Sequence, residues 1–336
     1  PKGKRRRFRF FKHLPPGQRL LLYMVLPALS GVVTSSSVPA GKSDATGVIR
    51  VSNVEPFSLA YRMDVLEDEL RKASDKKRLR AGVFAVEPKS GRYVELDARA
   101  PYSAASIIKV PVFVSLLVAL DRGELKPTDL LTIRQDLITG GSGYLQWRPV
   151  DSKLSVKDTA ELMIVISDNT ATNMLIDALG GREKLNNQFK SWGLKHTRLN
   201  NMLADLEGTN TTSPFELAYL MGRIDNGELI SDQSREWMYN VMKRTRTRTL
   251  LPQGIGPGAK IFHKTGDIGR MVGDAGIVEA PNGHRFIVAV QVERPHNDRR
   301  ANEMIRSLSK LIYKSFCQDS ATDGSMIESA THSPAR

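Results

Sequence analysis

Length, composition and charge exclude several classes of protein. The chain has 336 residues, of which 40% are hydrophobic and 25% are charged, a composition typical of a globular protein with one or two domains. One cysteine, Cys317, excludes an intramolecular disulfide framework, and six histidines without metal-ligand spacing give no reason to expect a metal or another cofactor. The net charge is +13, but eight of these charges lie in the first 19 residues, so we expect no nucleic-acid partner.

The N-terminal segment predicts export. A basic head precedes an apolar run over residues 20–34, and Val38-Pro39-Ala40 then places small residues at the spacing that a signal peptidase reads. The apolar run is shorter than the roughly 20 residues of a typical membrane-spanning helix. We therefore expect residues 1–40 to be a signal peptide or an uncleaved N-terminal anchor, with membrane contact only here. The folded part is expected in the periplasm or outside the cell.

The first part of the folded region is expected to contain one helix and two strands. Residues 41–54 lack apolar periodicity and are interpreted as a linker. From residue 57 to about 78, apolar residues recur at helical spacing among many charges, which predicts a surface helix with one buried stripe. Residues 82–86 and 93–96 have the pattern of short strands, and the segment 88–91 between them is typical of a hairpin turn.

The middle of the chain is predicted to be helical. Residues 107–120, 156–167 and 170–179 carry apolar residues at helical spacing. The second of these helices follows Ser155, which forms the sequence pattern of a capping box with Asp158. We expect no comparable strand in this part of the chain.

Strand patterns return near the end of the chain. Residues 260–263, 271–279 and 285–292 are predicted strands, and a Pro-Asn-Gly turn separates the last two. An amphipathic helix is predicted over residues 297–316. The polar residues 317–336 that follow are interpreted as a mobile tail.

Together these elements predict an α/β (α+β) protein. A five-stranded, mostly antiparallel sheet would be covered by the terminal helices and joined to an all-α lobe, with a ligand cleft between the two. The catalytic domain is expected over residues 55–316, its α/β part formed by 55–99 and 258–316 and its all-α part by 100–257. We expect the protein to be a monomer.

Ser106 and Lys109 are the first candidates for catalysis. They lie one helical turn apart, so a hydroxyl and an amine face the same side, as a serine nucleophile and its base require. The same spacing occurs at residues 74–77 and 307–310, but both copies lie in charged surface helices. Lys109 instead continues into the strongly apolar segment 110–120, which should bury its side chain and lower the pKa of its amine. A neutral amine accepts the serine proton.

Two further motifs follow. Ser167-Asp168-Asn169 lies between two predicted helices, and Lys264-Thr265-Gly266 lies at the end of a predicted strand. Each tripeptide alone is weak, because Ser167 and Asn169 would also suit a helix cap and Lys264 an exposed strand position. The occurrence of all three motifs in one chain, in this order and on these predicted elements, is far rarer by chance than any one motif alone.

With these motifs the chain resembles the class A serine β-lactamases, within the penicillin-recognising serine hydrolases, over about residues 55–316. Residues 103–109, the stretch 163–173 and the Thr-Thr-Ser-Pro sequence at 211–214 carry further similarity. The resemblance implies a β-lactamase/transpeptidase-like fold and an acyl-enzyme on Ser106. It also implies a β-lactam or a D-alanyl peptide as substrate and no cofactor.

The resemblance implies a role for each motif residue. Ser106 would attack the carbonyl, Lys109 would serve in proton transfer, and Ser167 would relay a proton to the leaving nitrogen. The remaining substrate contacts would come from Asn169 for an amide, from Lys264 and Thr265 for a carboxylate, and from the backbone N–H groups of Ser106 and Asp267 for the oxyanion. Tyr144, in a glycine-rich loop, would gate the cleft or remain a surface aromatic.

The chain departs from the class A pattern in the loop that serves deacylation. Leu199 and Asn200 match the Leu-Asn pair of Glu-x-x-Leu-Asn, but His196 occupies the place of the glutamate. Asp205 and Glu207 lie too far along to replace it. A neutral His196 with a water held by Asn200 is the expected substitute, so slow deacylation is predicted.

A second departure concerns substrate binding. The arginine that usually follows Lys-Thr-Gly is missing, because Gly273-Asp274 lies in that region. Three functions therefore stay open: a β-lactam-hydrolysing enzyme, a D-alanyl-D-alanine peptidase acting on peptidoglycan, and a β-lactam-binding protein without turnover. A signalling protein would need an output domain, and the short basic head offers none.

Overall fold

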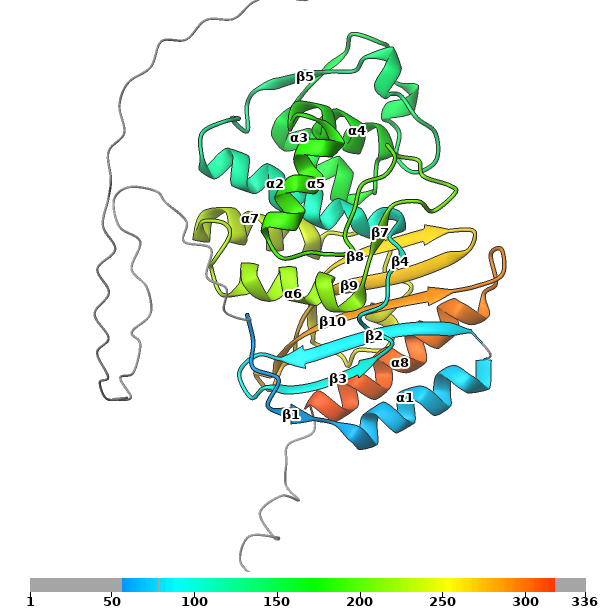
Figure 1. Cartoon of the computed structure of the whole chain (residues 1–336). Helices are drawn as coiled ribbons and strands as arrows, with labels where there is room; N and C mark the ends of the chain where they lie inside the picture. Colours follow the sequence, from blue (N-terminus) through cyan, green and yellow to red (C-terminus); the bar gives the residue numbers. More distant parts are fainter. Residues whose placement is uncertain (1–55, 78, 318–336) are drawn as a thin grey trace, which may run out of the picture. The chain divides into compact units, whose positions relative to one another are not determined.

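Six strands form one sheet in the computed structural model, which describes residues 56–77 and 79–317 (Figure 1). The strands are β1 (Tyr61–Arg62), β2 (Arg80–Glu87), β3 (Arg92–Leu96), β8 (Lys260–Ile268), β9 (Met271–Glu279) and β10 (Arg285–Glu293). Their order is β1-β3-β2-β10-β9-β8, and every pair except β1 and β3 is antiparallel. The mostly antiparallel sheet is therefore confirmed, with β8 at one edge. The predicted signal segment and linker lie outside the described residues, as does the predicted tail after Cys317.

The start of the domain corrects two expectations, the five strands and the helix from residue 57. Tyr61 pairs in parallel with Arg92 and adds a sixth, very short strand. Met63 donates its backbone N–H to the carbonyl of Tyr93 at 2.8 Å, so the chain stays extended here and α1 covers only Asp64–Lys77. Two strand residues give no alternating pattern long enough to recognise in a sequence.

Helices α1 and α8 (Arg300–Cys317) cover one face of the sheet (Figure 1). Their apolar stripes meet the strands in one core, where Leu70 and Leu308 are buried with Val83 and Val288. Burying a leucine or valine side chain contributes roughly 1.5–3 kcal/mol, so this layer explains why both ends of the described chain fold back onto the same sheet.

The other face of the sheet carries α6 (Pro214–Asp225), and the remaining helices of the described chain lie on this side, except η4, which packs against α8 (Figure 1). They are η1 (Ala105–Ile108), α2 (Lys109–Asp121), η2 (Gln135–Leu137), η3 (Leu145–Trp147), α3 (Val156–Val165), α4 (Asn169–Ala178), α5 (Gly181–Ser191), α7 (Asp232–Lys243) and η4 (Leu251–Gln253). Two small two-stranded antiparallel sheets pair β4 (Tyr102–Ser103) with β7 (Thr211–Thr212) and β5 (Leu130–Thr132) with β6 (Lys153–Ser155). The predicted capping box before α3 is confirmed, since Ser155 Oγ accepts the backbone N–H of Asp158 at 3.0 Å.

A second core runs from the sheet into the helices. It joins Phe84 on β2 and Ile287 on β10 to Leu217 on α6 and Phe113 on α2. Helix α6, which falls within the predicted all-α part, thus packs directly on the sheet, where Phe215 meets Phe84 edge to face at 5.1 Å.

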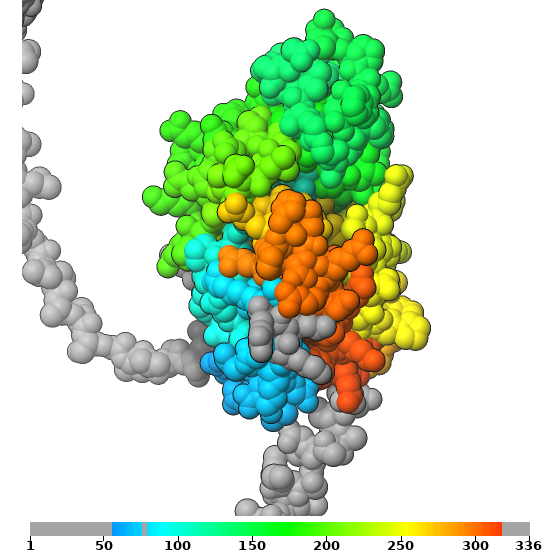
Figure 2. Space-filling view, turned by 90° about the vertical axis from the view of Figure 1, so that its right-hand side faces the viewer, coloured from blue at the N-terminus to red at the C-terminus, as the bar shows by residue number. Residues whose placement is uncertain are grey.

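The two ends of the described chain build one half of the folded unit. In Figure 2 the blue and cyan residues lie with the orange and red ones, and the green residues gather on the other side. Across the part of the chain that the structure describes, no helix has both the length and the apolar character needed to cross a bilayer.

Candidate active site

The turn that carries Ser106 is pressed against the edge strand β8. Ala104 donates its backbone N–H to the carbonyl of Asn210 at 2.7 Å, which fixes the approach to η1. At Gly266 an added Cβ would lie 2.8 Å from Ile107 Cγ1 and 3.0 Å from Ile107 N, so only glycine permits this crossing. The glycine of Lys-Thr-Gly therefore brings β8 next to the serine.

Lys109 is fully buried at the centre of the site. Its Nζ lies 3.0 Å from Ser106 Oγ, 2.7 Å from Ser167 O, 3.0 Å from Ser167 Oγ and 2.7 Å from Asn169 Oδ1. An ammonium has three N–H groups for these four oxygens, whereas a neutral amine can accept a proton from one of the hydroxyls. Burial, together with the positive charge of Lys264, holds the pKa of Lys109 well below its usual range. The arrangement favours the neutral amine, which can take the proton of Ser106.

Ser167 lies between two amines. Its Oγ is 3.0 Å from Lys109 Nζ and 3.1 Å from Lys264 Nζ, and Lys264 also donates to the Thr265 carbonyl at 2.7 Å. Burial lowers the pKa of Lys264 to about 8, against the opposing effect of the Asp274 carboxylate. Ser167 has a backbone φ of +60°, a conformation that costs a non-glycine residue of order 1–3 kcal/mol and clusters at functional sites.

Asp168, which the sequence analysis did not single out, holds this turn in place. One carboxylate oxygen caps α4 by accepting the N–H of Ala171 at 2.9 Å, and the other accepts Tyr144 N at 2.8 Å and Leu145 N at 2.9 Å. The capping role thus belongs to Asp168, not to its neighbours in the motif. An aspartate before an apolar helix was the available signal.

Asn169 and Tyr144 line the same region from different elements. Asn169 accepts from Lys109 through Oδ1 and donates through Nδ2 to Gly140 O at 3.0 Å, leaving its second N–H available for a ligand. The Tyr144 side chain is 46% exposed on the loop that Asp168 fixes. Its predicted gating role stays a prediction.

Thr265 and Asp267 lie inside β8 rather than after it, because the strand continues to Ile268 and the predicted end at His263 is too early. The Thr265 side chain is nearly buried, and Asp267 pairs with Arg294 at the end of β10. In the described residues no group of three or more His, Cys, Asp or Glu is placed to hold a metal ion.

Comparison with known proteins agrees with this geometry. The family model described as "Beta-lactamase enzyme family" matches residues 65–316, three quarters of the chain. The chain belongs to the β-lactamase enzyme family. It is 24% identical over 271 residues to the extended-spectrum β-lactamase PER-1 of Pseudomonas aeruginosa, covering 74% of this chain and 86% of that protein. It is 28% identical to a β-lactamase of Streptomyces fradiae, covering 71% and 82%.

Among solved structures, PBP-A is 45% identical, with a TM-score of 0.76 over 78% of this chain and 99% of PBP-A. A PBP-A variant with glutamate in place of leucine, solved as the acyl-enzyme with penicillin G, is 46% identical with a TM-score of 0.75, covering 76% and 97%. The β-lactamase/transpeptidase-like fold and the resemblance to class A enzymes are confirmed, and the chain is a serine hydrolase of this family.

In the loop that corresponds to the deacylation loop of class A enzymes, His196 has different surroundings from those that we expected. The structure places His196 in a separate pocket of 280 Å³ with Phe215 and Tyr219, and its backbone N–H donates to Glu216 at 2.8 Å. Asn200 uses its side chain to hold the loop, donating to Thr209 O at 2.6 Å. In the described part of the chain, no hydrogen bond joins the side chain of His196 or Asn200 to Ser106 or Lys109.

Leu203 is tied to α4, the helix that begins with Asn169. Asn173, one helical turn after Asn169, binds the Leu203 backbone twice, accepting its N–H at 2.9 Å and donating to its carbonyl at 2.6 Å. An added Cβ on Gly141 would lie 2.9 Å from Asn169 Nδ2 and 3.9 Å from Ala204 Cβ, so both residues lie next to Gly141. No sequence signal marked this segment, since its position depends on an asparagine 30 residues away.

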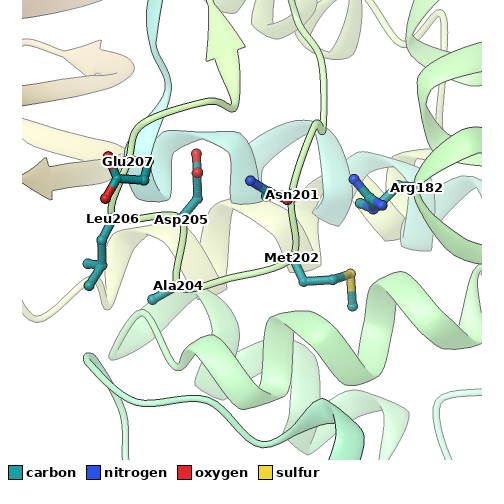
Figure 3. A pocket seen from close by; sticks show the side chains of 7 residues that line it. All are labelled: Arg182, Asn201, Met202, Ala204, Asp205, Leu206 and Glu207. Carbon is teal, nitrogen blue, oxygen red and sulfur yellow. The ribbon is translucent and has the colours of Figure 1, made fainter.

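The two acids of the loop, Asp205 and Glu207, line a pocket together with Arg182, which lies at its opposite end from Glu207 (Figure 3). The pocket has a volume of 390 Å³ and is also lined by Asn201, Met202, Ala204 and Leu206. Asp205 is nearly buried, and its carboxylate closes the loop by accepting Asn210 N at 2.6 Å and Thr209 Oγ1 at 2.8 Å. Glu207 is exposed. Asp205 is therefore committed to holding the loop.

The position of the missing arginine is closed to any side chain. A Cβ on Gly273 would lie 2.7 Å from Val290 O and 2.9 Å from Ile107 Cδ1. The neighbouring Asp274 is fully buried and binds His263 at 2.8 Å behind Lys264. Lys264 and Thr265 thus remain for a substrate carboxylate.

Proposed function

We propose that this protein is an exported penicillin-binding serine acyl-hydrolase that is acylated readily at Ser106 and releases the acyl group slowly. The observation that carries the proposal is a contrast on α4: Asn169 accepts a hydrogen bond from the base Lys109, whereas Asn173, one turn later, holds the backbone of Leu203. The base for acylation is in place. The loop contributes a leucine and an alanine where a water-activating group is needed.

Acylation begins at the buried amine. Lys109 takes the Ser106 proton as Oγ attacks the carbonyl, and the backbone N–H groups of Ser106 and Asp267 stabilise the oxyanion. Ser167, hydrogen-bonded to Lys109 and Lys264, passes a proton to the leaving nitrogen. The transfers from Ser106 to Lys109 and from Lys109 to Ser167 follow hydrogen bonds of 3.0 Å that exist before substrate binds.

Substrate class follows from the cations and amides around the serine. Lys264 and Thr265 suit a carboxylate, and the unused N–H of Asn169 suits an amide carbonyl. A penicillin and a peptide ending in D-alanyl-D-alanine carry both groups, so we propose a D-alanyl peptide as natural substrate and penicillin as its mimic. The chain is more similar to PBP-A than to the β-lactamases compared above, which supports a D-alanyl peptide as the natural substrate and penicillin as its mimic.

The test is a time course of intact mass after mixing the purified protein with penicillin G. We expect one added ligand that persists for minutes or longer, and a burst of ring opening followed by slow turnover. Rapid ring opening without an adduct would replace the proposal with an efficient β-lactamase, the function favoured by the named curated relatives. Release of D-alanine from a D-alanyl-D-alanine peptide would establish the natural substrate class. Size-exclusion chromatography tests the expected monomer.

A further inference from the structure

An acid follows the Lys-Thr-Gly motif, and a buried arginine lies against it. Arg294 Nη2 pairs with Asp267 and donates to the Ile268 carbonyl at 3.2 Å, while Nη1 donates to Asn302 Oδ1 at 3.0 Å. The Arg294 side chain is 3% exposed and that of Asp267 is 56% exposed. The guanidinium is therefore fixed by β8 on one side and by α8 on the other.

The carboxylate of Asp267 lies where negative charge is unfavourable for the reaction. Under the proposed function, the N–H of Asp267 stabilises the oxyanion, and covalent geometry keeps the carboxylate of the same residue within about 4 Å of that N–H. Two negative charges roughly 6 Å apart repel enough to slow a reaction about threefold in a water-like medium and about a hundredfold at an effective dielectric constant of 20. An acid at this position needs a nearby cation.

We propose that Arg294 is a positioning residue for acyl transfer, which neutralises Asp267 beside the oxyanion hole and holds the Ile268 carbonyl at the end of β8. The inference rests on the proposed function. Of the neighbouring side chains, His296 lies against Gly269, and Asp298 pairs with Arg300. Only Arg294 among these contacts Asp267 in the described structure.

Three variants of the full chain test the neutralisation, each read as the acylation rate constant with penicillin G. Arg294→Gln is expected to be about tenfold slower at pH 7.5, because Asp267 keeps an unpaired charge. The double variant Arg294→Gln/Asp267→Asn should be acylated at least about threefold faster than Arg294→Gln alone. Asp267→Asn alone should be about two- to threefold faster than the wild type, since the arginine then faces the oxyanion unopposed. If the ion pair were only structural, Asp267→Asn would instead be acylated more slowly than the wild type.

The pH dependence gives a second signature. Burial raises the pKa of Asp267 and Arg294 opposes this effect, so removing the arginine moves the carboxyl towards protonation. The rate of Arg294→Gln relative to the wild type should therefore rise as pH falls from 8 to 5. For Arg294→Gln/Asp267→Asn, the rate relative to the wild type should not change between pH 8 and 5. His296 is present in every variant, so any effect of it is the same in both rates of the ratio.

The outcomes separate the two proposals. An acylated wild type, with Arg294→Gln and the double variant equally slow, would overturn the role of Arg294 and leave the proposed function standing. Asp267→Asn at or below the wild-type rate would do the same, and it tests the proposal even where Arg294→Gln fails to fold. A wild type that penicillin G does not acylate would overturn both proposals.

Discussion

The serine network and the loop over residues 196–210 are built differently. Ser106, Lys109, Ser167 and Lys264 are linked by direct hydrogen bonds among elements anchored in the core. The loop has one strand pairing, between Arg198 and Thr211, and is otherwise held largely by polar side chains such as Asn173. The first step of catalysis thus depends on groups that already contact one another, and the second on a loop whose described apolar contacts with the core come from Leu199, Met202 and Leu203.

The largest expected effect is the loss of the nucleophile. Ser106→Ala should abolish covalent labelling by a fluorescent penicillin and leave the free energy of unfolding within about 1 kcal/mol, because the hydroxyl serves chemistry rather than packing. Gel fluorescence and thermal unfolding measure the two. Ser307→Ala, which alters a surface copy of the same spacing, is the matched control and should label like the wild type. Labelling that survives without Ser106 would remove it from the mechanism.

Removal of the base comes next. Lys109→Ala should slow acylation by at least about a hundredfold, the low end for a lost general base. In the wild type the rate should fall as pH falls, since the neutral amine is the active form and protonation removes it. Rapid-quench mass spectrometry across pH checks both, with Lys310→Ala as control. An unchanged rate would mean that another group accepts the proton.

The loop can be tested by restoring an acid. Leu203→Glu should shorten the life of the penicillin adduct by about tenfold or more, because Asn173 holds this backbone beside Asn169 and a carboxylate there can activate water. His196→Glu places the same acid in the separate pocket and should leave the adduct's life within about twofold. Intact-mass decay measures both. A faster decay only in His196→Glu would return the deacylation role to that position.

The smallest effect concerns the substrate carboxylate. Lys264 has a pKa of about 8, so its charge is present below that pH and is lost as pH rises above it. The preference for penicillin G over its neutral methyl ester should therefore drop by about fivefold between pH 7 and 9. Relative acylation rates check this, and Lys264→Ala should show no such drop. A constant preference in the wild type would leave Lys264 without a carboxylate role.

The sequence predicted the parts of the molecule that depend on local pattern. The strand over residues 271–279 matches β9 residue for residue, and the three motifs meet as expected. The deacylation role of His196, assigned from its spacing to Leu199, stays a prediction, and the structure places this residue in a separate pocket. One error arose where the structure depends on a distant partner, because β1 forms only where β3 lies beside it. Arg294 was missed for the same reason, since it lies 27 residues after Asp267.

The core that joins Phe84 and Ile287 of the sheet to Phe113 of α2 has a consequence for motion. A close-packed interior resists sliding, so the two halves should unfold as one cooperative unit and cannot part like hinged domains. Ligand entry then relies on surface segments such as residues 140–144, which move on nanosecond to microsecond times. We therefore expect the residues around Ser106 to keep their arrangement while surface loops determine how a ligand reaches them.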